Sequence, residues 1–543
     1  MIEINGVSVF SGVAIGELRF LQKRRRETER VEAADSAAEL ERFEAARGEA
    51  DMELERLCEK ATKEVGEEEA AIFDVHRMML SDPDYLEAIG GIITGEGVTA
   101  EYAVSRASET FAEMFSSMDD PYMSGRAADV RDIAERLLAK LSNGDEGRPA
   151  LSAPAILAAR DLSPSDTIQL EKEKTLGFVT SGGSANSHTA ILARTMSIPA
   201  LVNLGEKLLP EYDGHFAALD GFTGTLYIDP DAETLTAMEK KKAESAEARA
   251  RLEGLKGKAN VTIDGRRVKV FANVSGLADI EAVLENDAEG IGLFRSEFIY
   301  MESDCFPSEE RQFEIYRRAV EKMGDREVVI RTLDIGADKQ AAYFDLPHEQ
   351  NPAMGMRGIR ICLTRPEIFQ TQLRALLRAS VYGKLAIMFP MIASPREVDE
   401  AMSVMEEARE SLRRQNIPFR EDISVGIMIE TPSAVMMSAE LAERADFFSV
   451  GTNDLTQYTL AADRQNQQIE RFYDARSEAV LRMIKIVADN AHAAGKWVGI
   501  CGEMGADTEL TEKFLRMGID EISVSPGALL PLRRKIRSLD LSK

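Results

Sequence analysis

The stretch Gly290-Ile-Gly-Leu-Phe-Arg295 is a short apolar run that ends on an arginine, and it sets the pattern for the second half of the chain. A bounded run of this length is typical of a buried strand in a parallel sheet. Because helix-length segments separate most of these runs, they predict a (β/α)8 barrel rather than an open sheet. The eight runs are Val268–Val274, Gly290–Arg295, Val328–Leu333, Leu385–Met391, Val425–Glu430, Phe447–Gly451, Trp497–Cys501 and Ile522–Ser525.

Polar residues gather where these runs end, and barrel enzymes keep their active sites at the carboxyl ends of their strands. Several arginines with carboxylates on one rim indicate a site for a small, multiply charged anion and a hard cation, because guanidinium groups bind phosphate and carboxylate bidentately. Salt bridges that close the barrel are the alternative for some of these arginines. The strand-end residues are Asn273, Arg295, Arg331, Asp334, Glu430, Asn453, Asp454 and Cys501, while Arg357, Arg360 and Arg464 occupy loops.

Two of the carboxylates, Glu430 and Asp454, form a pair that can hold Mg²⁺, which leaves other coordination positions to water and substrate oxygens. Cys501 has two interpretations. A buried thiol at a strand end is usually a packing residue, but inside an anion site it can act as a general acid toward substrate carbon. The long gap from 333 to 385 predicts an irregular excursion of the chain.

The first half of the chain changes pattern twice. Residues 1–20 alternate as strands do, and from 33 to 143 apolar residues recur at three- and four-residue steps, as in amphipathic helices. The turn signals Ser81-Asp-Pro-Asp84 and Asp119-Asp-Pro121 separate helical segments. One expected helix carries Leu40 to Ala61, others cover about 67–81, 98–117 and 125–142, and strands return at Ala155–Ala158, Thr175–Val179, Ala200–Val202 and Thr225–Ile228.

These patterns predict an α/β multidomain protein, in which an α/β domain with an inserted helical subdomain precedes the barrel. Residues 233–257 are rich in Ala, Glu, Lys and Arg and lack a wide apolar face, which predicts a solvated connecting helix that can serve as a hinge. The expected boundaries are 1–32 and 144–230 for the α/β domain, 33–143 for the helical subdomain, 231–258 for the linker helix and 259–543 for the barrel.

A small-residue loop, Ser181-Gly-Gly-Ser-Ala-Asn-Ser187, delivers His188 to the first turn of an expected helix. A phosphate on this imidazole would face free backbone N–H groups and the positive end of the helix dipole. The loop therefore suggests a phosphohistidine that carries phosphate covalently. The alternative is a helix cap or a packing residue.

The composition excludes several classes of protein. A formal charge of −27 argues against a nucleic-acid partner and is compatible with a basic protein partner or simply with solubility. No apolar run approaches the roughly 20 residues that a transmembrane helix requires, so no membrane insertion is expected. The four cysteines form no C-x-x-C pair, which favours a reducing cytoplasm over a disulfide framework or a zinc site.

Over almost its full length the chain resembles the Enzyme I family of the bacterial phosphoenolpyruvate-dependent sugar phosphotransferase system. The resemblance rests on segments that occur in the expected order. They are Ala71-Ile-Phe-Asp-Val-His76 through Asp82, Met118-Asp-Asp-Pro-Tyr-Met123 through Arg126–Ile133, Ser187-His-Thr-Ala-Ile-Leu-Ala-Arg194 with Ile198-Pro-Ala200, Gly290-Ile-Gly-Leu-Phe-Arg-Ser-Glu-Phe298 and Val450-Gly-Thr-Asn-Asp-Leu-Thr-Gln-Tyr458.

The resemblance implies a swivelling phosphohistidine domain, a helical subdomain that binds the carrier protein HPr, and a barrel that binds phosphoenolpyruvate and forms a homodimer. It implies transfer of the phosphoryl group from phosphoenolpyruvate to His188 and on to HPr, with release of pyruvate, as the first step of sugar uptake. The implied roles are phosphorylation at His188, proton donation by Cys501, Mg²⁺ ligation by Glu430 and Asp454, and substrate contacts by Arg295, Arg331, Arg357, Asn453 and Arg464.

The chain departs from the family pattern just before the histidine. The family has a basic residue followed by Thr-Ser there, whereas this chain has Ala185-Asn-Ser187 and no local cation. Two other readings remain open. A dikinase or phosphoenolpyruvate synthase shares the histidine domain and the barrel, but segment 33–143 is too short for a nucleotide-grasping domain and has no Gly-rich phosphate loop. A regulatory protein that only senses phosphoenolpyruvate is the second.

Overall fold

The computed structural model divides the chain into two compact units, Met1–Ala248 and Arg249–Lys543. It describes residues 1–21, 28–64, 67–117, 121–142, 153–160, 174–183, 193, 198–336, 339, 341–464 and 466–543. Among these residues, no helix combines the length and the apolar character needed to cross a lipid bilayer.

The first unit contains a mixed sheet whose strands come from both sides of a helical insertion, as the sequence predicts. Within the described residues the strand order is β1-β8-β7-β3-β4-β5-β6-β2, with β3, β4, β5 and β6 parallel. Its core consists of buried apolar side chains such as Ile156, Leu201 and Leu219. The strands are β1 (Ile2–Asn5), β2 (Val7–Phe10), β3 (Val13–Phe20), β4 (Ala155–Ala159), β5 (Thr175–Thr180), β6 (Ala200–Val202), β7 (Phe216–Asp220) and β8 (Thr225–Ile228).

A single residue, Gly6, separates β1 from β2, although these strands lie at opposite ends of the strand order. Consecutive Cα atoms are about 3.8 Å apart, so the end of β1 and the start of β2 must lie close together. The sheet is therefore strongly curled. The Gly6 amide donates to the carbonyl of Gly224 at 2.9 Å, and the Ser8 hydroxyl of β2 donates to the carbonyl of Gly221, in the turn between β7 and β8.

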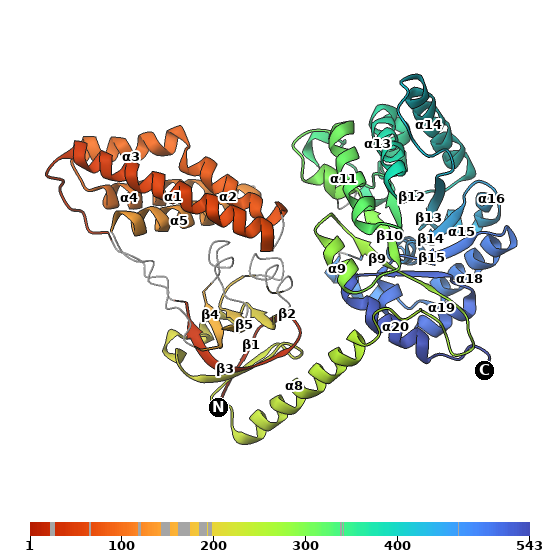
Figure 1. The fold of residues 1–543 in the computed structure, drawn as a ribbon, viewed down its shortest axis with the longest axis horizontal. Coiled ribbons are helices and arrows are strands. Elements are labelled where there is room, and N and C mark those ends of the chain that lie inside the picture. The colour runs from red at the N-terminus through yellow and green to blue at the C-terminus, as the bar shows by residue number, and fades with distance from the viewer. Residues whose placement is uncertain are drawn as a thin grey trace. The chain divides into compact units, whose positions relative to one another are not determined.

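The insertion is a bundle of long helices that run alongside one another (Figure 1). Apolar residues spaced by three and four, including Phe43, Ala50, Leu54 and Leu57, fill its core as the sequence predicts. The helices are α1 (Ser36–Glu64), α2 (Glu67–Leu80), α3 (Pro83–Glu96), α4 (Ala100–Ser116) and α5 (Pro121–Leu141).

The helix α3 and the strand β7 were not predicted. The sequence Ser81–Asp84 does form a turn, but it also starts α3: the Asp82 carboxylate accepts hydrogen bonds from the amides of Asp84 and Tyr85, and Pro83 occupies the first turn. A proline is favourable there because its missing N–H would have had no partner in the helix. The same Asp-Pro pair therefore marks both a turn and a helix start.

The connecting helix predicted over 233–257 is α8 (Ala232–Glu253), and the division between the two units falls within it. Near its start α8 packs on the first unit. Met238 is buried against Val13 and Ala218, and Lys241 Nζ lies 2.6 Å from Asp220 Oδ2. The remaining turns of the helix are largely exposed.

The second unit confirms the predicted (β/α)8 barrel. Within its described residues eight parallel strands close on themselves, with β16 pairing with β9. Each strand lies within two residues of the predicted apolar run. The strands are β9 (Lys269–Val274), β10 (Gly290–Arg295), β11 (Glu327–Arg331), β12 (Lys384–Phe389), β13 (Ser424–Ile429), β14 (Phe447–Val450), β15 (Trp497–Ile500) and β16 (Glu521–Val524).

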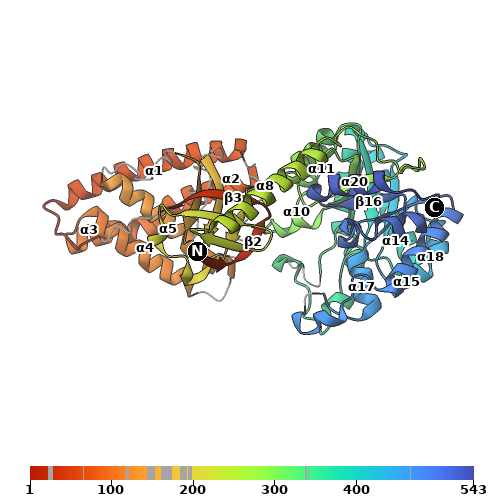
Figure 2. The same ribbon diagram turned by 90° about the horizontal axis from the view of Figure 1, so that it is seen from below.

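Helices cover the outside of the barrel and bury its main hydrophobic core between themselves and the strands (Figures 1 and 2). A second, smaller cluster that includes Leu293, Met388, Met428 and Cys501 fills the barrel interior. The helices are α9 (Asp279–Glu285), α10 (Glu297–Met301), α11 (Glu309–Met323), α12 (Ile359–Thr364), α13 (Pro366–Ala379), α14 (Pro395–Arg414), α15 (Pro432–Met436), α16 (Ser438–Ala442), α17 (Thr452–Leu460), α18 (Glu478–Ala493), α19 (Thr511–Met517) and α20 (Leu529–Ser538).

In the described residues of the predicted excursion after β11, two short 3-10 helices, Ala342–Phe344 and Pro352–Met354, precede α12, which begins at Ile359. Glycine lets two parts of this excursion approach each other. A Cβ on Gly336 (φ +116°) would lie 2.9 Å from the Cα of Arg357, and a Cβ on Gly358 (φ +55°) would lie 3.1 Å from Asp334 Oδ1. These two glycines thus allow the excursion to bring Arg357 into contact with Asp334.

Candidate active site

The predicted site residues of the second unit lie at one end of the barrel. Arg295 and Arg331 are the last residues of β10 and β11 and face each other in the strand register. Glu430 directly follows β13, Cys501 directly follows β15, and Asp454 lies in the first turn of α17, after β14. Because the strands are parallel, these positions share the rim at which barrel enzymes bind substrates.

Arg331 is held between two fully buried carboxylates. Its Nη2 lies 2.5 Å from Glu297 Oε1, and its Nη1 lies 3.0 Å from Asp334 Oδ2. Its Nε is buried and has no hydrogen-bond partner among the described residues. A buried donor without a partner is costly, so this nitrogen favours an anionic ligand at the rim.

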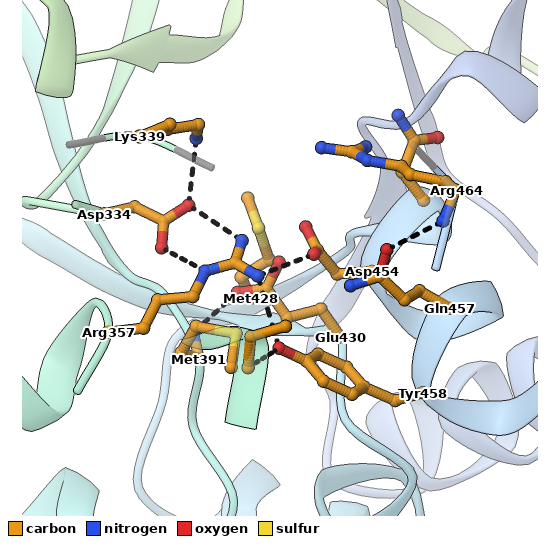
Figure 3. A network of polar contacts seen from close by, with 12 residues as sticks. Asp334, Lys339, Arg357, Met391, Met428, Glu430, Asp454, Gln457, Tyr458 and Arg464 are labelled. Atoms are coloured by element: carbon orange, nitrogen blue, oxygen red, sulfur yellow. Dashed lines mark hydrogen bonds and ion pairs between the residues drawn. The ribbon is translucent and has the colours of Figure 1, made fainter. Parts of the chain in front are cut away.

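Arg357 is nearly as buried, at 2% exposure, and contacts two carboxylates and a phenol (Figure 3). One edge of the guanidinium faces Asp334, with Nε 3.2 Å from Oδ1 and Nη2 3.3 Å from Oδ2. Its Nη1 donates to Asp454 Oδ1 at 2.8 Å and to the Tyr458 hydroxyl at 3.2 Å. Arg357 therefore links the excursion to Asp454, one of the two carboxylates predicted to bind a metal ion.

Glu430 is fully buried, and only one of its oxygens has a partner among the described residues. The amide of Met391 donates to Oε1 at 2.6 Å, whereas Oε2 has no hydrogen bond. Burial, together with the nearby carboxylates of Asp454 and Asp334, raises the pKa of Glu430 to about 8. A cation beside Glu430 would lower this pKa again, because it would stabilise the ionised carboxylate.

The donor set fits a hard divalent cation. Glu430 Oε2 is an unpartnered buried acceptor, and Asp454 Oδ1 is occupied by a guanidinium, itself a cation. Within the described part of the chain no group of three or more His, Cys, Asp or Glu side chains gathers as a complete metal site. Two carboxylates with open positions for water and substrate oxygens are characteristic of Mg²⁺ sites rather than of structural metal cages.

The remaining predicted substrate contacts are less buried. Arg295 has no hydrogen bond or ion pair to any other described side chain, so its charge is available at the rim. Asn453 pairs with the loop after β15: its Nδ2 donates to Glu503 Oε1 at 3.3 Å, and its Oδ1 accepts from the Glu503 amide at 3.1 Å. The backbone amide of Arg464 donates to Gln457 Oε1 at 3.2 Å (Figure 3).

Two of the polar residues that the sequence singles out, Arg360 and Asn273, hydrogen-bond to the backbone. Arg360 Nη1 donates to the carbonyls of Met354 and Gly355, at 2.7 and 2.9 Å. Asn273 Nδ2 bridges the carbonyls of Cys501 and Ser523, both at 3.2 Å. Arg360 thus holds its own loop through hydrogen bonds to the backbone, and not through a salt bridge that closes the barrel.

Cys501 points its thiol into the barrel interior. The side chain is buried, and its Sγ lies 3.7 Å from the carbonyl oxygen of Val450. Burial raises the pKa of Cys501 to about 12, so the thiol keeps its proton at neutral pH. A protonated thiol can donate a proton, as a general acid must, and it cannot serve as a resting thiolate nucleophile.

His188 and the loop residues 184–187 lie outside the described residues. The last described residue before them, Gly183, follows β5 and has a φ of +88°. The phosphohistidine interpretation, and the question of what replaces the missing basic residue, therefore rest on the sequence.

Sequence reasoning did not single out Lys339 and gave Glu297 no role. Lys339 Nζ lies 2.7 Å from Glu297 Oε1 and 3.2 Å from Asp334 Oδ2, so a third cation joins Arg331 and Arg357. Glu297 stands two residues after a strand-end arginine, a position that can reach the same rim. For Lys339 no comparable signal exists, because it lies in an irregular segment.

The helical motif around His76 holds the bundle together. The imidazole is fully buried in α2; its Nε2 lies 3.2 Å from Asp129 Oδ1 and its Nδ1 lies 3.6 Å from Asp132 Oδ2, both on α5. Met78, two residues further along α2, is 73% exposed. Motif residues thus link α2 to α5, while a neighbouring apolar side chain faces outward.

Known protein families match three parts of the chain. Residues 249–541 match a family described as "PEP-utilising enzyme, PEP-binding domain", which spans the barrel. Residues 5–126 match "PEP-utilising enzyme, N-terminal", and residues 151–224 match "PEP-utilising enzyme, mobile domain". The first match alone covers more than half of the chain and places the candidate site in a phosphoenolpyruvate-binding family.

Full-length relatives agree. The phosphoenolpyruvate-protein phosphotransferase of Priestia megaterium is 43% identical over 99% of this chain and 94% of that protein. The protein of the same name from Bacillus subtilis (strain 168) is 42% identical over 99% of this chain and 95% of that protein. A solution structure of an Enzyme I is 36% identical, with a TM-score of 0.39, over 45% of this chain and 99% of that one. On its matches to these full-length relatives, the chain belongs to the Enzyme I family, the phosphoenolpyruvate-protein phosphotransferases.

Proposed function

We propose that the chain transfers the phosphoryl group of phosphoenolpyruvate to its own His188 and then to a histidine of the carrier HPr. Pyruvate is the other product, and the reaction is the first step of sugar uptake. The observation that carries the proposal is the buried group of cations at the rim of the barrel, led by Arg331 and Arg357, beside the carboxylates Glu430 and Asp454.

In this proposal the substrate's phosphate and carboxylate lie against the cations of the rim. Arg331 offers its unpartnered Nε, and Arg295 has no other described partner. Arg357 offers its Nη1 edge, Asn453 comes from the first turn of α17, and Arg464 comes from the loop that follows this helix. Guanidinium groups suit this task, because they bind phosphate and carboxylate oxygens through paired hydrogen bonds.

Glu430 and Asp454 are the residues that would hold Mg²⁺. When bound there, Mg²⁺ neutralises charge on the substrate oxygens. The chain's own contribution is the buried Glu430, which the Met391 amide orients through one oxygen so that the other faces the site.

The bond changes are those of an in-line displacement. A neutral imidazole nitrogen of His188 attacks phosphorus, the N–P bond forms, and the bond from phosphorus to the enol oxygen breaks. The leaving enolate takes a proton at carbon from the Cys501 thiol, which gives pyruvate, and water reprotonates the thiolate. The protein supplies mainly positioning and charge stabilisation.

Partners follow from the same proposal. HPr would dock on the helical bundle, where an exposed apolar side chain such as Met78 offers a contact. The phosphohistidine domain would swing between HPr and the barrel by using α8 as its hinge. A homodimer through the barrel and a cytoplasmic location complete the proposal, and the scattered cysteines favour the latter.

The decisive experiment is transfer of labelled phosphate from phosphoenolpyruvate to purified HPr, with and without Mg²⁺. We expect an acid-labile label on the chain, then on HPr, together with stoichiometric pyruvate and little transfer after chelation. A protein that only senses phosphoenolpyruvate would bind it and release no pyruvate.

The substitution His188→Ala should abolish labelling of the chain and of HPr, because no nucleophile remains to accept phosphate. The far-ultraviolet circular dichroism and the melting temperature should stay at wild-type values. His215→Ala is a matched control, because among the described residues the side chain of this exposed histidine contacts Asp229 and the ring of Tyr212, both away from His188 in the sequence, and the variant should keep full labelling. Persistent labelling of His188→Ala would refute the assignment.

A further inference from the structure

One carboxylate at the rim contacts three cations. Asp334 is fully buried three residues after the end of β11, and its Oδ2 lies 3.0 Å from Arg331 Nη1 and 3.2 Å from Lys339 Nζ. Arg357 contacts both oxygens, through Nε at 3.2 Å and Nη2 at 3.3 Å (Figure 3). Buried cations this close repel one another unless a carboxylate lies between them.

The two edges of the Arg357 guanidinium bind different partners. Asp334 takes the Nε–Nη2 edge in a two-bond fork, a geometry that fixes the plane of the guanidinium. The remaining Nη1 reaches Asp454 and Tyr458. If Asp454 takes a different partner, Nη1 keeps only the Tyr458 hydroxyl, while the opposite edge stays anchored on Asp334. Asp334 is therefore the fixed attachment of Arg357, and Asp454 is the exchangeable one.

The backbone supports this attachment. Gly358 adopts a φ of +55°, and a Cβ there would lie 3.1 Å from Asp334 Oδ1. The amide of Leu333 donates to Gln372 Oε1 at 2.9 Å, which ties the strand end beside Asp334 to α13. Asp334 is thus fixed by its surroundings before any ligand arrives, as a preorganised electrostatic site requires.

We infer that Asp334 is a positioning residue, which holds Arg357, Arg331 and Lys339 in a single arrangement directed at the substrate anion. The inference rests on the proposed function. Glu297 assists, because it shares Arg331 and Lys339 with Asp334. The negative charge of Asp334 alone would repel an anionic substrate. Asp334 can therefore favour substrate binding only through the cations that it aligns.

The test uses the full-length protein and the variant Asp334→Asn, which keeps the size of the side chain and removes its charge. We expect the KM for phosphoenolpyruvate to rise at least ten-fold and kcat to fall, in an assay of pyruvate release with HPr as acceptor. Misaligned cations would bind both the substrate and the transition state less tightly, whereas a purely structural role of Asp334 would leave KM unchanged.

Asp287→Asn is the matched control. Asp287 also binds a buried arginine of the same barrel, with Oδ2 2.6 Å from Arg533 Nη1, but it precedes β10 and lies at the opposite end from the site. We expect Asp287→Asn to lower the melting temperature, as Asp334→Asn does, but to leave the KM within two-fold of wild type.

The outcomes are distinct. A wild-type protein that releases no pyruvate refutes the proposed function, and the inference falls with it. If the wild type turns over normally and the KM of Asp334→Asn stays within two-fold, only the inference is refuted. If Asp334→Asn does not fold, Asp334→Glu decides: it keeps the charge but displaces the carboxylate by one methylene, so a KM within two-fold of wild type refutes the positioning role.

Discussion

Two arginines of the barrel unit are equally buried, each at 2% exposure, and differ in what holds them. Arg533, on α20, lies at the end where the strands begin. Its Nε donates to Asn260 Oδ1 at 2.8 Å, and its Nη1 donates to the Leu255 carbonyl at 2.9 Å and to Asp287 Oδ2 at 2.6 Å. Its Nη2 donates to the backbone carbonyl of Asp287 at 2.6 Å. Backbone oxygens thus provide two of its four contacts.

Arg357, at the other end, is held by side chains alone within the described part of the chain: the carboxylates of Asp334 and Asp454 and the hydroxyl of Tyr458. A carbonyl in the backbone cannot leave its place without unfolding, whereas a carboxylate can exchange one cation for another. Burial therefore does not distinguish a structural arginine from a functional one. The nature of the acceptors does.

The largest expected effect is on activity, from Arg357→Met. Removal of one buried donor from a preorganised anion site should lower kcat/KM for phosphoenolpyruvate by roughly 10²–10³-fold. The unfolding free energy should fall less than in Arg533→Met, because Asp334 keeps Arg331 and Lys339 as partners. Steady-state kinetics and chemical denaturation measure the two quantities. If the variant unfolds readily and retains its kcat/KM, Arg357 is a structural arginine like Arg533.

The next largest effect is on stability, from Arg533→Met. Removing one partner of a buried ion pair typically costs about 3–5 kcal/mol, and here it also leaves the Leu255 and Asp287 carbonyls without their donors. The expected result is a lower denaturation midpoint of the barrel unit with the KM for phosphoenolpyruvate unchanged in the folded protein. A large change in KM would show that the two ends of the barrel are not independent.

A smaller effect concerns Glu521 on β16, a buried carboxyl that accepts a hydrogen bond from Ser523. Burial raises the pKa of Glu521 to about 8, from an ordinary value of 4.5. Between these values the folded protein keeps a proton that the unfolded chain has lost, so wild-type stability should fall as the pH rises toward 8 and level off above it.

The substitution Glu521→Gln should remove that dependence. Relative to wild type, the variant should gain about 1 kcal/mol in unfolding free energy between pH 6 and pH 7, because one pKa unit corresponds to about 1.4 kcal/mol. Denaturation curves of both proteins across this range provide the measurement, and all other titrations cancel in the difference. Parallel pH profiles would show that Glu521 is ionised in the folded barrel.

The sequence predicted the barrel well because its signal is local. Each apolar run, such as Gly290–Arg295, is a buried strand in its own right, and the residue at its end needs no further information to be placed at the rim. The helix α3 was missed because Asp82-Pro83 has the same composition as a turn. A local pattern is ambiguous where two structures begin with the same residues.

The site was only partly predictable for a different reason. Arg357 and Asp334 are separated by 23 residues of chain that is mostly irregular, and no periodicity relates them. The pairing of Arg357 with Asp454 spans 97 residues. Which carboxylate binds which guanidinium depends on the folded excursion, and in particular on the backbone approach at Gly336 and Gly358. The role of Lys339 follows only from its contacts with Glu297 and Asp334 in the folded protein.

The single residue between β1 and β2 affects how the first unit meets other chains. A sheet ordinarily leaves two rows of unpaired N–H and C=O groups at its margins, and such rows recruit strands from neighbouring molecules into aggregates. Here both marginal strands have only four residues, and Gly6 ties the end of one to the start of the other. The two marginal strands therefore lie close together at this point, which protects the first unit against strand exchange with neighbouring molecules.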